Sequence, residues 1–256
     1  MTTSDPIRFA VGTFTRLPVP APTATTTAVA GRGLALAPLV GAAIGLVSGA
    51  LLLVTGVDLI ARLLSATLVV ASAAWITRGL HWDGLADVAD GLGSGAPAER
   101  AREIMGRSDI GPFGVLALGF TIALQALSLA QLPAGTPALA GWVLAVTLGR
   151  LAAVVACGPW ARAARRDGLG ATVIGSVTPA RMVVAGVVTT VVAVAAAGAG
   201  PLPWSTALLW GPLAAVGLAL GLGWLARKRF GGSSGDVLGA TVELATVAVL
   251  LILALQ

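Results

Sequence analysis

The stretch Leu34–Gly56 reads LALAPLVGAAIGLVSGALLLVTG and contains no charged residue. A helix needs about 20 predominantly apolar residues to cross the hydrocarbon core of a bilayer, and this stretch meets that requirement. Six further stretches are also predominantly apolar, with at most one charged residue each: Leu59–Thr77, Pro112–Leu132, Pro137–Cys157, Pro179–Gly198, Trp204–Leu225 and Val237–Leu255. The pattern predicts an all-α polytopic membrane protein with about seven transmembrane helices. We expect them to form one integral-membrane domain over residues 1–256.

The composition of the chain supports this class. Apolar residues make up 57% of the sequence, charged residues only 11%, and the mean hydropathy is +0.93. Soluble domains carry about a quarter charged residues, so most of this chain is expected to face lipid or other apolar helices. The net charge of +5 fits the Lys and Arg excess of cytoplasmic loops, and we expect no nucleic-acid partner. The single cysteine, Cys157, cannot support a disulfide framework.

Basic residues are distributed unevenly between the predicted loops. Fourteen of the 16 Lys and Arg residues lie before the first predicted span, in the three long loops or, as Arg181 does, at the edge of such a loop, whereas the opposite side holds only Arg62, near the start of its span. Because cytoplasmic loops of membrane proteins are enriched in Lys and Arg, we expect the N-terminus and the long loops in the cytoplasm. The C-terminus is then periplasmic, and the protein is a multi-pass component of the inner cell membrane.

The segment Gly79–Gly91 (GLHWDGLADVADG) carries Asp83, Asp87 and Asp90. On a helix, their spacing places them within about 60° of one another. Three close carboxylates repel unless a cation neutralises them, and such ligands suit Mg²⁺ shared with substrate phosphates. A solvated helix face is the alternative, which we disfavour because the stripe directly follows a predicted span. His81, the only histidine, is a minor candidate for proton transfer.

Arginines dominate the segment Glu99–Gly114. Arg100 and Arg107 could bind a diphosphate opposite the acids, because guanidinium groups bind phosphate oxygens in a bidentate way. The alternative is an amphipathic interfacial helix with internal Glu–Arg pairs, which we favour for Arg102 and Glu103.

The turn Gly231–Gly235 (GGSSG) leads into the last predicted span. Backbone N–H groups at Gly232 and Ser234 could form a phosphate cradle at the start of a helix. Alone, such a turn is often a linker, but Asp236 and Glu243 follow it on one helix face and favour a site.

Arg150 and Glu243 are ionisable residues inside predicted spans. Glu243 lies roughly 10 Å into its span at 1.5 Å per residue, and an ionisable group at such depth is costly unless paired. We predict that Arg150 and Glu243 contact each other, or that both face the active-site cavity and help to bind substrate. The basic run Trp160–Gly170 could bind either lipid headgroups or a substrate anion.

Five motifs in the chain are Phe14–Pro20, Gly79–Gly91, Ile104–Gly111, Asp167–Gly170 and Gly231–Ala240. In this order they resemble the motifs of cobalamin synthases, the adenosylcobinamide-GDP ribazoletransferases. The resemblance runs from about residue 8 to the end of the chain. One departure lies at Met105–Gly111 (MGRSDIG), where Arg107 replaces an acid and Asp109 replaces a base of the usual family pattern. This exchange puts a direct catalytic role of either residue in doubt.

The resemblance implies a phosphoryl-transfer reaction. The ribose hydroxyl of α-ribazole, or of its 5′-phosphate, attacks the cobinamide-linked phosphate of adenosylcobinamide-GDP, and GMP leaves. Mg²⁺ is implied, held by Asp83, Asp87 and Asp90, with arginines such as Arg100 stabilising the transferring group. Asp90 or Asp236 would accept the proton of the hydroxyl. Homo-oligomers and other late cobalamin-pathway enzymes are possible partners on family grounds only.

Other functions remain in competition at this stage. A CDP-alcohol phosphatidyltransferase expects an Asp-Gly-x-x-Ala-Arg motif, but the segment Asp83–Asp87 (DGLAD) has no arginine at the required place. A vitamin or ion transporter would need a polar path through the bilayer, and the predicted spans offer little beyond Arg150 and Glu243. A membrane scaffold would not need three acids on one stripe.

Overall fold

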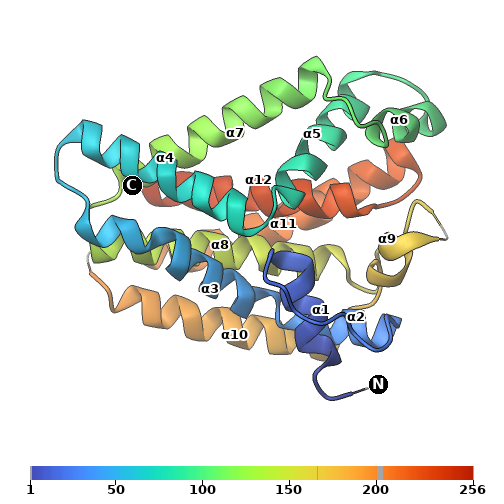
Figure 1. Ribbon diagram of the computed structural model, residues 1–256, viewed down its shortest axis with the longest axis horizontal. Coiled ribbons are helices and arrows are strands. Elements are labelled where there is room, and N and C mark those ends of the chain that lie inside the picture. Colours follow the sequence, from blue (N-terminus) through green and yellow to red (C-terminus); the bar gives the residue numbers. More distant parts are fainter. Residues whose placement is uncertain (1, 166, 201–203, 256) are drawn as a thin grey trace.

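The structure is a computed structural model that describes the chain apart from Met1, Arg166, residues 201–203 and Gln256 (Figure 1). The described residues form helices joined by loops, with a single isolated bridge between Ala163 and Ser233. In chain order the helices are α1 (Asp5–Phe14), α2 (Thr27–Ala35), α3 (Ala37–Gly49), the 3-10 helix η1 (Ala50–Val54), α4 (Leu59–Ile76), α5 (Leu80–Gly93), α6 (Ala98–Met105), α7 (Pro112–Gln131), α8 (Thr136–Ala156), α9 (Gly168–Val173), α10 (Pro179–Ala197), α11 (Trp204–Phe230) and α12 (Gly235–Ala254).

Seven of these segments are long and apolar enough to cross a membrane. They are α3 continued by η1, and α4, α7, α8, α10, α11 and α12, which confirms the predicted all-α polytopic class. Two boundaries differ from the prediction. Leu34 belongs to the separate helix α2, because Pro38 starts a new helix in the first turn of α3. Helix α11 continues to Phe230, so the basic residues 227–229 lie on its last turn instead of in a loop.

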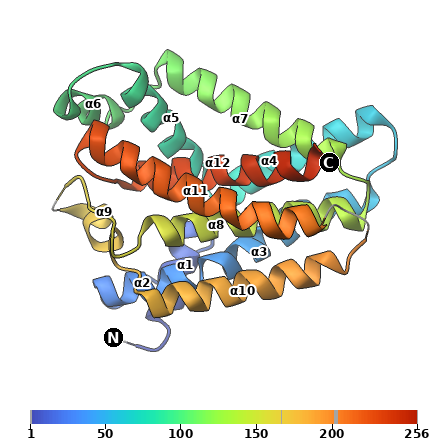
Figure 2. The ribbon, with the colours of Figure 1, turned by 180° about the vertical axis from the view of Figure 1, so that it is seen from behind.

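The long helices run side by side along the longest axis of the molecule (Figures 1 and 2). Helix α8 lies at the centre and is buried over almost its whole length. Helices α3, α10, α11 and α12 pack around α8, while α5 and α7 pack on α12. The two termini lie toward opposite ends of the long axis (Figure 1).

Glycines allow α3 to approach α8 closely. A methyl group at Gly41 would lie 2.9 Å from the carbonyl oxygen of Val146, and one at Gly45 would lie 2.9 Å from Cα of Val143. Small residues of this kind let membrane helices pack backbone to backbone, where van der Waals contact replaces the hydrophobic effect as the driving force.

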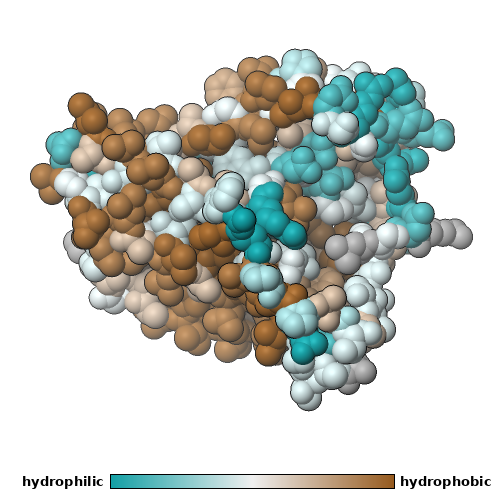
Figure 3. Space-filling view, viewed as in Figure 1, coloured by the Kyte–Doolittle hydropathy of each residue, from teal (hydrophilic) through white to brown (hydrophobic). Residues whose placement is uncertain are grey.

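Polar and apolar side chains occupy different regions of the surface. On the face in Figure 3, hydrophilic residues gather over α5 and α6 at one end of the long axis, and apolar residues cover most of the remainder. Large exposed apolar side chains such as Val54, Leu64, Phe120 and Val191 lie on the predicted spans. Contiguous apolar surface of this extent marks a membrane-facing region.

Candidate active site

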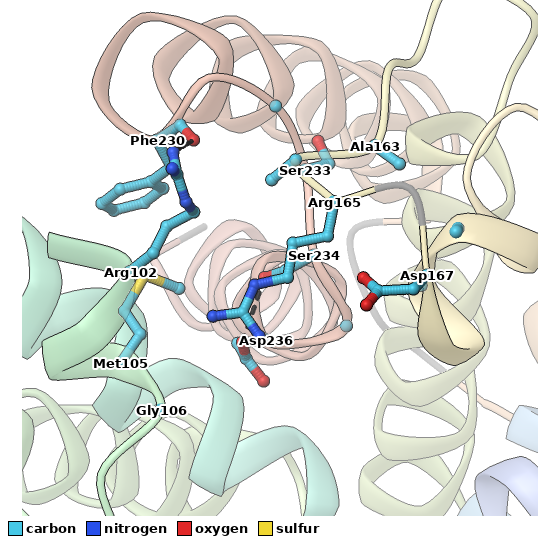
Figure 4. A pocket seen from close by; sticks show the side chains of 15 residues that line it. Arg102, Met105, Gly106, Ala163, Arg165, Asp167, Phe230, Ser233, Ser234 and Asp236 are labelled. Carbon is cyan, nitrogen blue, oxygen red and sulfur yellow. Dashed lines mark hydrogen bonds between the residues drawn. The ribbon is translucent and has the colours of Figure 1, made fainter. Parts of the chain in front are cut away.

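A pocket of about 170 Å³ opens at the polar end of the molecule (Figure 4). It lies between α6, the segment that leads into α9, and the turn between α11 and α12. Its lining residues are Arg102, Met105, Gly106, Ala163, Ala164, Arg165, Asp167, Gly170, Ala171, Phe230, Gly232, Ser233, Ser234, Gly235 and Asp236. Three of the five motifs recognised in the sequence therefore meet in one cavity, although they are far apart in the chain.

The turn Gly231–Gly235 is fixed by its neighbours. The backbone N–H of Ser233 donates to the carbonyl of Arg162, and the N–H of Ala164 donates to the carbonyl of Ser233, both at 2.8 Å. A methyl group at Gly232 would lie 2.6 Å from the nitrogen of Ala164, so only glycine fits there. Gly232 and Ser234, predicted as substrate-binding residues, both line the pocket.

Ser234 also begins α12. Its hydroxyl oxygen accepts from the backbone N–H of Val237 at 3.4 Å, the pattern of a helix N-cap. The same hydroxyl donates to the carboxylate of Asp236 at 3.0 Å. The cap therefore orients the acid that faces the pocket from the first turn of the helix.

Two arginines enter the pocket from different elements. Arg102 of α6 donates to the carbonyl oxygen of Phe230 at 2.6 Å, which ties α6 to the end of α11. Arg165 reaches toward Asp236, while Asp167 faces them from the other side of the pocket (Figure 4). The pocket thus combines guanidinium groups that suit a phosphate with carboxylates that suit a cation or a proton.

Asp83 and Asp87 lie beside this pocket because α5 packs directly against the start of α12. A methyl group at Gly84 would lie 2.7 Å from Cα of Asp236. The pKa of Asp87 is raised to about 7, first by burial and then by the negative charges of Asp83, Asp236 and Asp90. Repelling carboxylates with a raised pKa are a mark of functional sites.

Asp90 has a different neighbourhood. Its carboxylate accepts from the backbone N–H groups of Gly111 at 2.7 Å and Gly114 at 2.9 Å, at the start of α7. Within the described residues, no group of three or more His, Cys, Asp or Glu side chains is arranged to hold a metal ion. The three predicted ligands therefore do not form a ready-made set, and the charge of Asp236, which was not among them, acts on Asp87 together with that of Asp83. The metal-binding and proton-accepting roles stay predictions.

Arg100 and Arg107 lie outside the pocket. Arg100 forms an ion pair with Glu103, and both side chains are more than half exposed, at 56% and 54%. Arg107 is exposed just beyond α6. Arg102, which was assigned to an interfacial helix surface, lines the pocket instead. The buried residues Ala101 and Met105 show which face of α6 turns inward. This apolar pair in the sequence indicates that the neighbouring Arg102 lies at the edge of the inward face.

Arg150 and Glu243 are buried at 3% and 5% exposure and line one small cavity in the membrane-spanning part of the bundle. No ion pair joins them in the described structure, so the two residues share this cavity without a direct charge contact. Glu243 instead accepts from the amide of Gln125 at 2.8 Å, and its Oε1 lies 3.9 Å from Nδ1 of His81. Neither Arg150 nor Glu243 lines the pocket that contains Asp236. Gln125 was overlooked, although an amide within an apolar span is a signal for such a contact.

His81 is buried next to this cluster at the start of α5. Burial lowers its pKa well below the usual value, and the positive charge of Arg150 lowers it further. The imidazole is therefore neutral at physiological pH, with its ring 5.7 Å from that of Phe14.

Comparison with known proteins shows the family to which the chain belongs. The profile of the family described as Cobalamin-5-phosphate synthase matches residues 6–254. A protein of Frankia casuarinae, named adenosylcobinamide-GDP ribazoletransferase, is 37% identical over 97% of this chain and 94% of its own length. Proteins of the same name from Nocardioides sp. and Rhizobium meliloti are 39% and 38% identical, over 96% and 98% of this chain and 97% and 96% of their own lengths. No solved structure matches the chain.

Proposed function

Because the chain belongs to the cobalamin-5-phosphate synthase family and is a transferase of cobalamin biosynthesis, we propose that it joins adenosylcobinamide-GDP to α-ribazole or α-ribazole 5′-phosphate. The ribose hydroxyl attacks the phosphorus that carries the cobinamide. The bond from that phosphorus to the GMP oxygen breaks, and GMP leaves. The product is adenosylcobalamin or its 5′-phosphate.

The observation that carries this proposal is the pocket shared by Arg102, Arg165, the Gly/Ser turn 231–235 and Asp236. A diphosphate substrate needs cationic donors on its oxygens, which the two arginines supply. The transferring group also needs to be held in line with an incoming hydroxyl, since phosphoryl transfer depends mainly on positioning and charge neutralisation. Three chain segments fixed to one another by hydrogen bonds offer such a rigid frame.

Asp236 is the favoured acceptor of the hydroxyl proton. It lies in the first turn of α12, receives a hydrogen bond from Ser234 and faces the pocket. Asp90 is a weaker candidate for this role because both of its carboxylate oxygens already accept backbone N–H groups. A base must be within reach of the proton it removes, so position decides between the two.

The carboxylates of Asp83 and Asp87 fit Mg²⁺, which is commonly bound by one or two carboxylates together with substrate phosphates. Burial and then charge repulsion raise the pKa of Asp87, and a divalent cation would relieve that repulsion. When bound, the ion would supply neutralising charge to the diphosphate and to the leaving GMP. The arginines then need to neutralise only the remaining phosphate charge.

We also propose that the protein lies in the inner cell membrane with this pocket facing the cytoplasm. The excess of Lys and Arg in the long loops supports this orientation, and the pocket lies among those loops. Nucleotide-linked substrates are cytoplasmic metabolites, so the orientation agrees with the proposed reaction.

An assay with purified protein in lipid vesicles tests the proposal. With adenosylcobinamide-GDP, α-ribazole and Mg²⁺, we expect GMP release together with an equal amount of cobamide, and neither product when EDTA removes the metal. Parallel reactions with α-ribazole 5′-phosphate and with a CDP-linked alcohol establish the acceptor preference and exclude a phosphatidyltransferase. Transfer of the CDP-linked alcohol without cobamide formation would contradict the proposal.

A further inference from the structure

A second concave surface lies away from the candidate active site, between α1, the chain just after it, α3 and the end of α4. This groove has a volume of about 430 Å³. Its walls are apolar apart from Thr15 and Arg16, and include Leu17, Leu39 and Val47. None of its lining residues belongs to the pocket that contains Asp236.

The groove is part of the folded structure. The buried carboxylate of Asp5 accepts from the backbone N–H and hydroxyl of Thr23, at 3.0 and 2.7 Å, which fixes the start of α1. At the other end of α1, the backbone N–H of Arg16 donates to the carbonyl of Ile76 at 2.7 Å. Helix α1 is therefore held at both ends, and the groove beneath it is preformed.

Positive charge lies at one end of the groove. The guanidinium group of Arg16 stacks 4.2 Å from the centre of the exposed Trp75 ring. Arg78, also exposed, follows Ile76 by two residues and donates to the carbonyl of Gly12 at 3.5 Å. Neither arginine forms an ion pair with a carboxylate among the described residues. A group of strongly hydrophilic residues, bordered by apolar ones, lies over the end of α4 in Figure 3.

The length of the groove along α3 is close to the hydrocarbon thickness of one bilayer leaflet. Leu39 and Val47 line it from α3, and eight residues of helix cover about 12 Å. Both side chains are more than half exposed, so the groove opens toward the membrane instead of toward the bundle interior. Arg16 lies at the end of the spans, where Arg and Trp side chains interact with headgroups.

We propose that this groove binds one anionic phospholipid, with an acyl chain along α3 and its phosphate at Arg16 and Arg78. Arginine is suited to phosphate oxygens, and a stacked, partly desolvated guanidinium binds them more strongly than a fully hydrated one. An uncharged groove would accept any lipid, whereas two arginines without acidic partners select a lipid with net negative charge. The proposal does not depend on the reaction that the protein catalyses.

The test is a lipid titration of delipidated protein in detergent, followed by native mass spectrometry. Phosphatidylglycerol and phosphatidylcholine with identical acyl chains are compared. We expect one tightly retained phosphatidylglycerol per chain and markedly weaker retention of phosphatidylcholine. Arg16→Gln should weaken phosphatidylglycerol binding about fivefold, the effect of one basic residue at a lipid surface, and leave phosphatidylcholine unchanged. Arg32→Gln, also an exposed arginine before the first span, is the matched control and should bind as the wild type does.

A second variant fills the groove. Ala43 lines it and is exposed, so Ala43→Trp should abolish tight retention without overfilling the protein core. The control is Val184→Trp, at a similar distance from the start of α10 and 50% exposed. If Ala43→Trp fails to fold, the arginine variants decide alone. Equal retention by Ala43→Trp and Val184→Trp, or full lipid preference in Arg16→Gln, overturns the proposal. So does displacement of the lipid by α-ribazole 5′-phosphate, which would assign the groove to a soluble substrate.

Discussion

At the scale of single residues, the four aspartates near the pocket are in two different environments. Asp83 and Asp236 lie close to Asp87, whose pKa is raised first by burial and then by their negative charges. Asp90 is satisfied by two backbone N–H groups instead. A carboxylate in the first situation gains from a cation, while one in the second already has its charge neutralised by dipoles.

The raised pKa of Asp87 gives a pH-dependent stability. Its folded pKa of about 7 exceeds the ordinary value of 3.8, so between these pH values the folded state keeps the proton that the unfolded state loses. Its contribution to stability is therefore present at low pH and lost as the pH rises toward 7. Asp87→Asn keeps the neutral form, and without Mg²⁺ it should raise the melting temperature at pH 8 by about 2–4 °C, after discounting for solvent screening.

The same variant should melt like the wild type at pH 4, because the wild-type carboxyl is then protonated in the folded state. Asp109→Asn, an exposed residue outside the pocket, should show no shift at either pH. Thermal unfolding in detergent measures both. A shift of equal size at pH 4 and pH 8 would show that ionisation of the buried carboxyl group is not its cause.

Arg102 and Arg100 provide a matched pair on one helix. Arg102→Gln removes a cationic group from the pocket and its hydrogen bond to Phe230, and should lower kcat/KM about tenfold or more. Arg100→Gln should stay within about twofold, because an exposed ion pair contributes little. Initial rates of GMP release measure the difference. The reverse order of effects would place the phosphate site on the other face of α6.

The sequence predicted Asp83, Asp87, Asp236 and the Gly/Ser turn as parts of one site, because each lies in a compact local motif. It did not predict the hydrogen bonds of Asp90, since the partners Gly111 and Gly114 follow about two dozen residues later and the helical spacing carries no information on them. Arg102 was misjudged for a related reason. Which face of a short polar helix turns inward depends on the packing of α6 against α5 and α11, which is non-local.

At the scale of elements, the site depends on close contact between α5 and α12. Gly84 faces Asp236 across this contact, and Gly239 of α12 faces the backbone of His81. Both approaches leave no room for a side chain. The contact places the acidic stripe of α5 beside the start of α12.

Gly84→Ala should separate these two helices. Its methyl group would meet the backbone of Asp236 at 2.7 Å, so α12 must shift, at an overpacking cost of about 1–3 kcal/mol. We expect lower thermal stability and strongly reduced turnover. Gly217→Ala on α11 adds the same methyl group where nothing lies within 4 Å and should be neutral. Wild-type turnover in Gly84→Ala would show that the contact does not position the site.

Substitutions of Asp90 test how the start of α7 is held in place. Asparagine keeps only one acceptor oxygen, so Asp90→Asn should retain one of the two hydrogen bonds at the start of α7, whereas Asp90→Ala loses both, at about 1 kcal/mol each. If Asp90 only positions α7, turnover should follow this order of stability. A complete loss of turnover in Asp90→Asn, with stability retained, would return Asp90 to the metal or proton-transfer site.

Helix ends were predicted well where the signal is local. Six of the seven predicted spans begin within about two residues of the observed helix, as expected when Pro or a polar cap marks the start. The end of α11 was placed too early because Arg227 to Arg229 looked like a loop. In the structure they occupy the last turn of the helix, where positive charge is favourable.

At the scale of the whole molecule, seven apolar helices form a bundle that carries the polar loops and short helices of the candidate site at one end. Hydropathy summed over about 20 residues predicts spans with little ambiguity, so the architecture was readable from the sequence. The neighbour relations around α8 were not, because an all-apolar sequence gives no unique pairing of helices. The candidate site lies where α5, α6 and α12 meet at that polar end, and its parts come from both halves of the chain.

The central claim is that acids from these two halves serve one reaction. Its most direct test is GMP release from adenosylcobinamide-GDP by Asp83→Asn and Asp236→Asn in vesicles, with Asp109→Asn as the control. Each of the first two variants should lose at least about 100-fold in turnover. Each removes a carboxylate that either holds the ion that neutralises the phosphates or accepts the proton. The control should remain within about threefold of the wild type. Near wild-type turnover in either Asp83→Asn or Asp236→Asn would contradict the account.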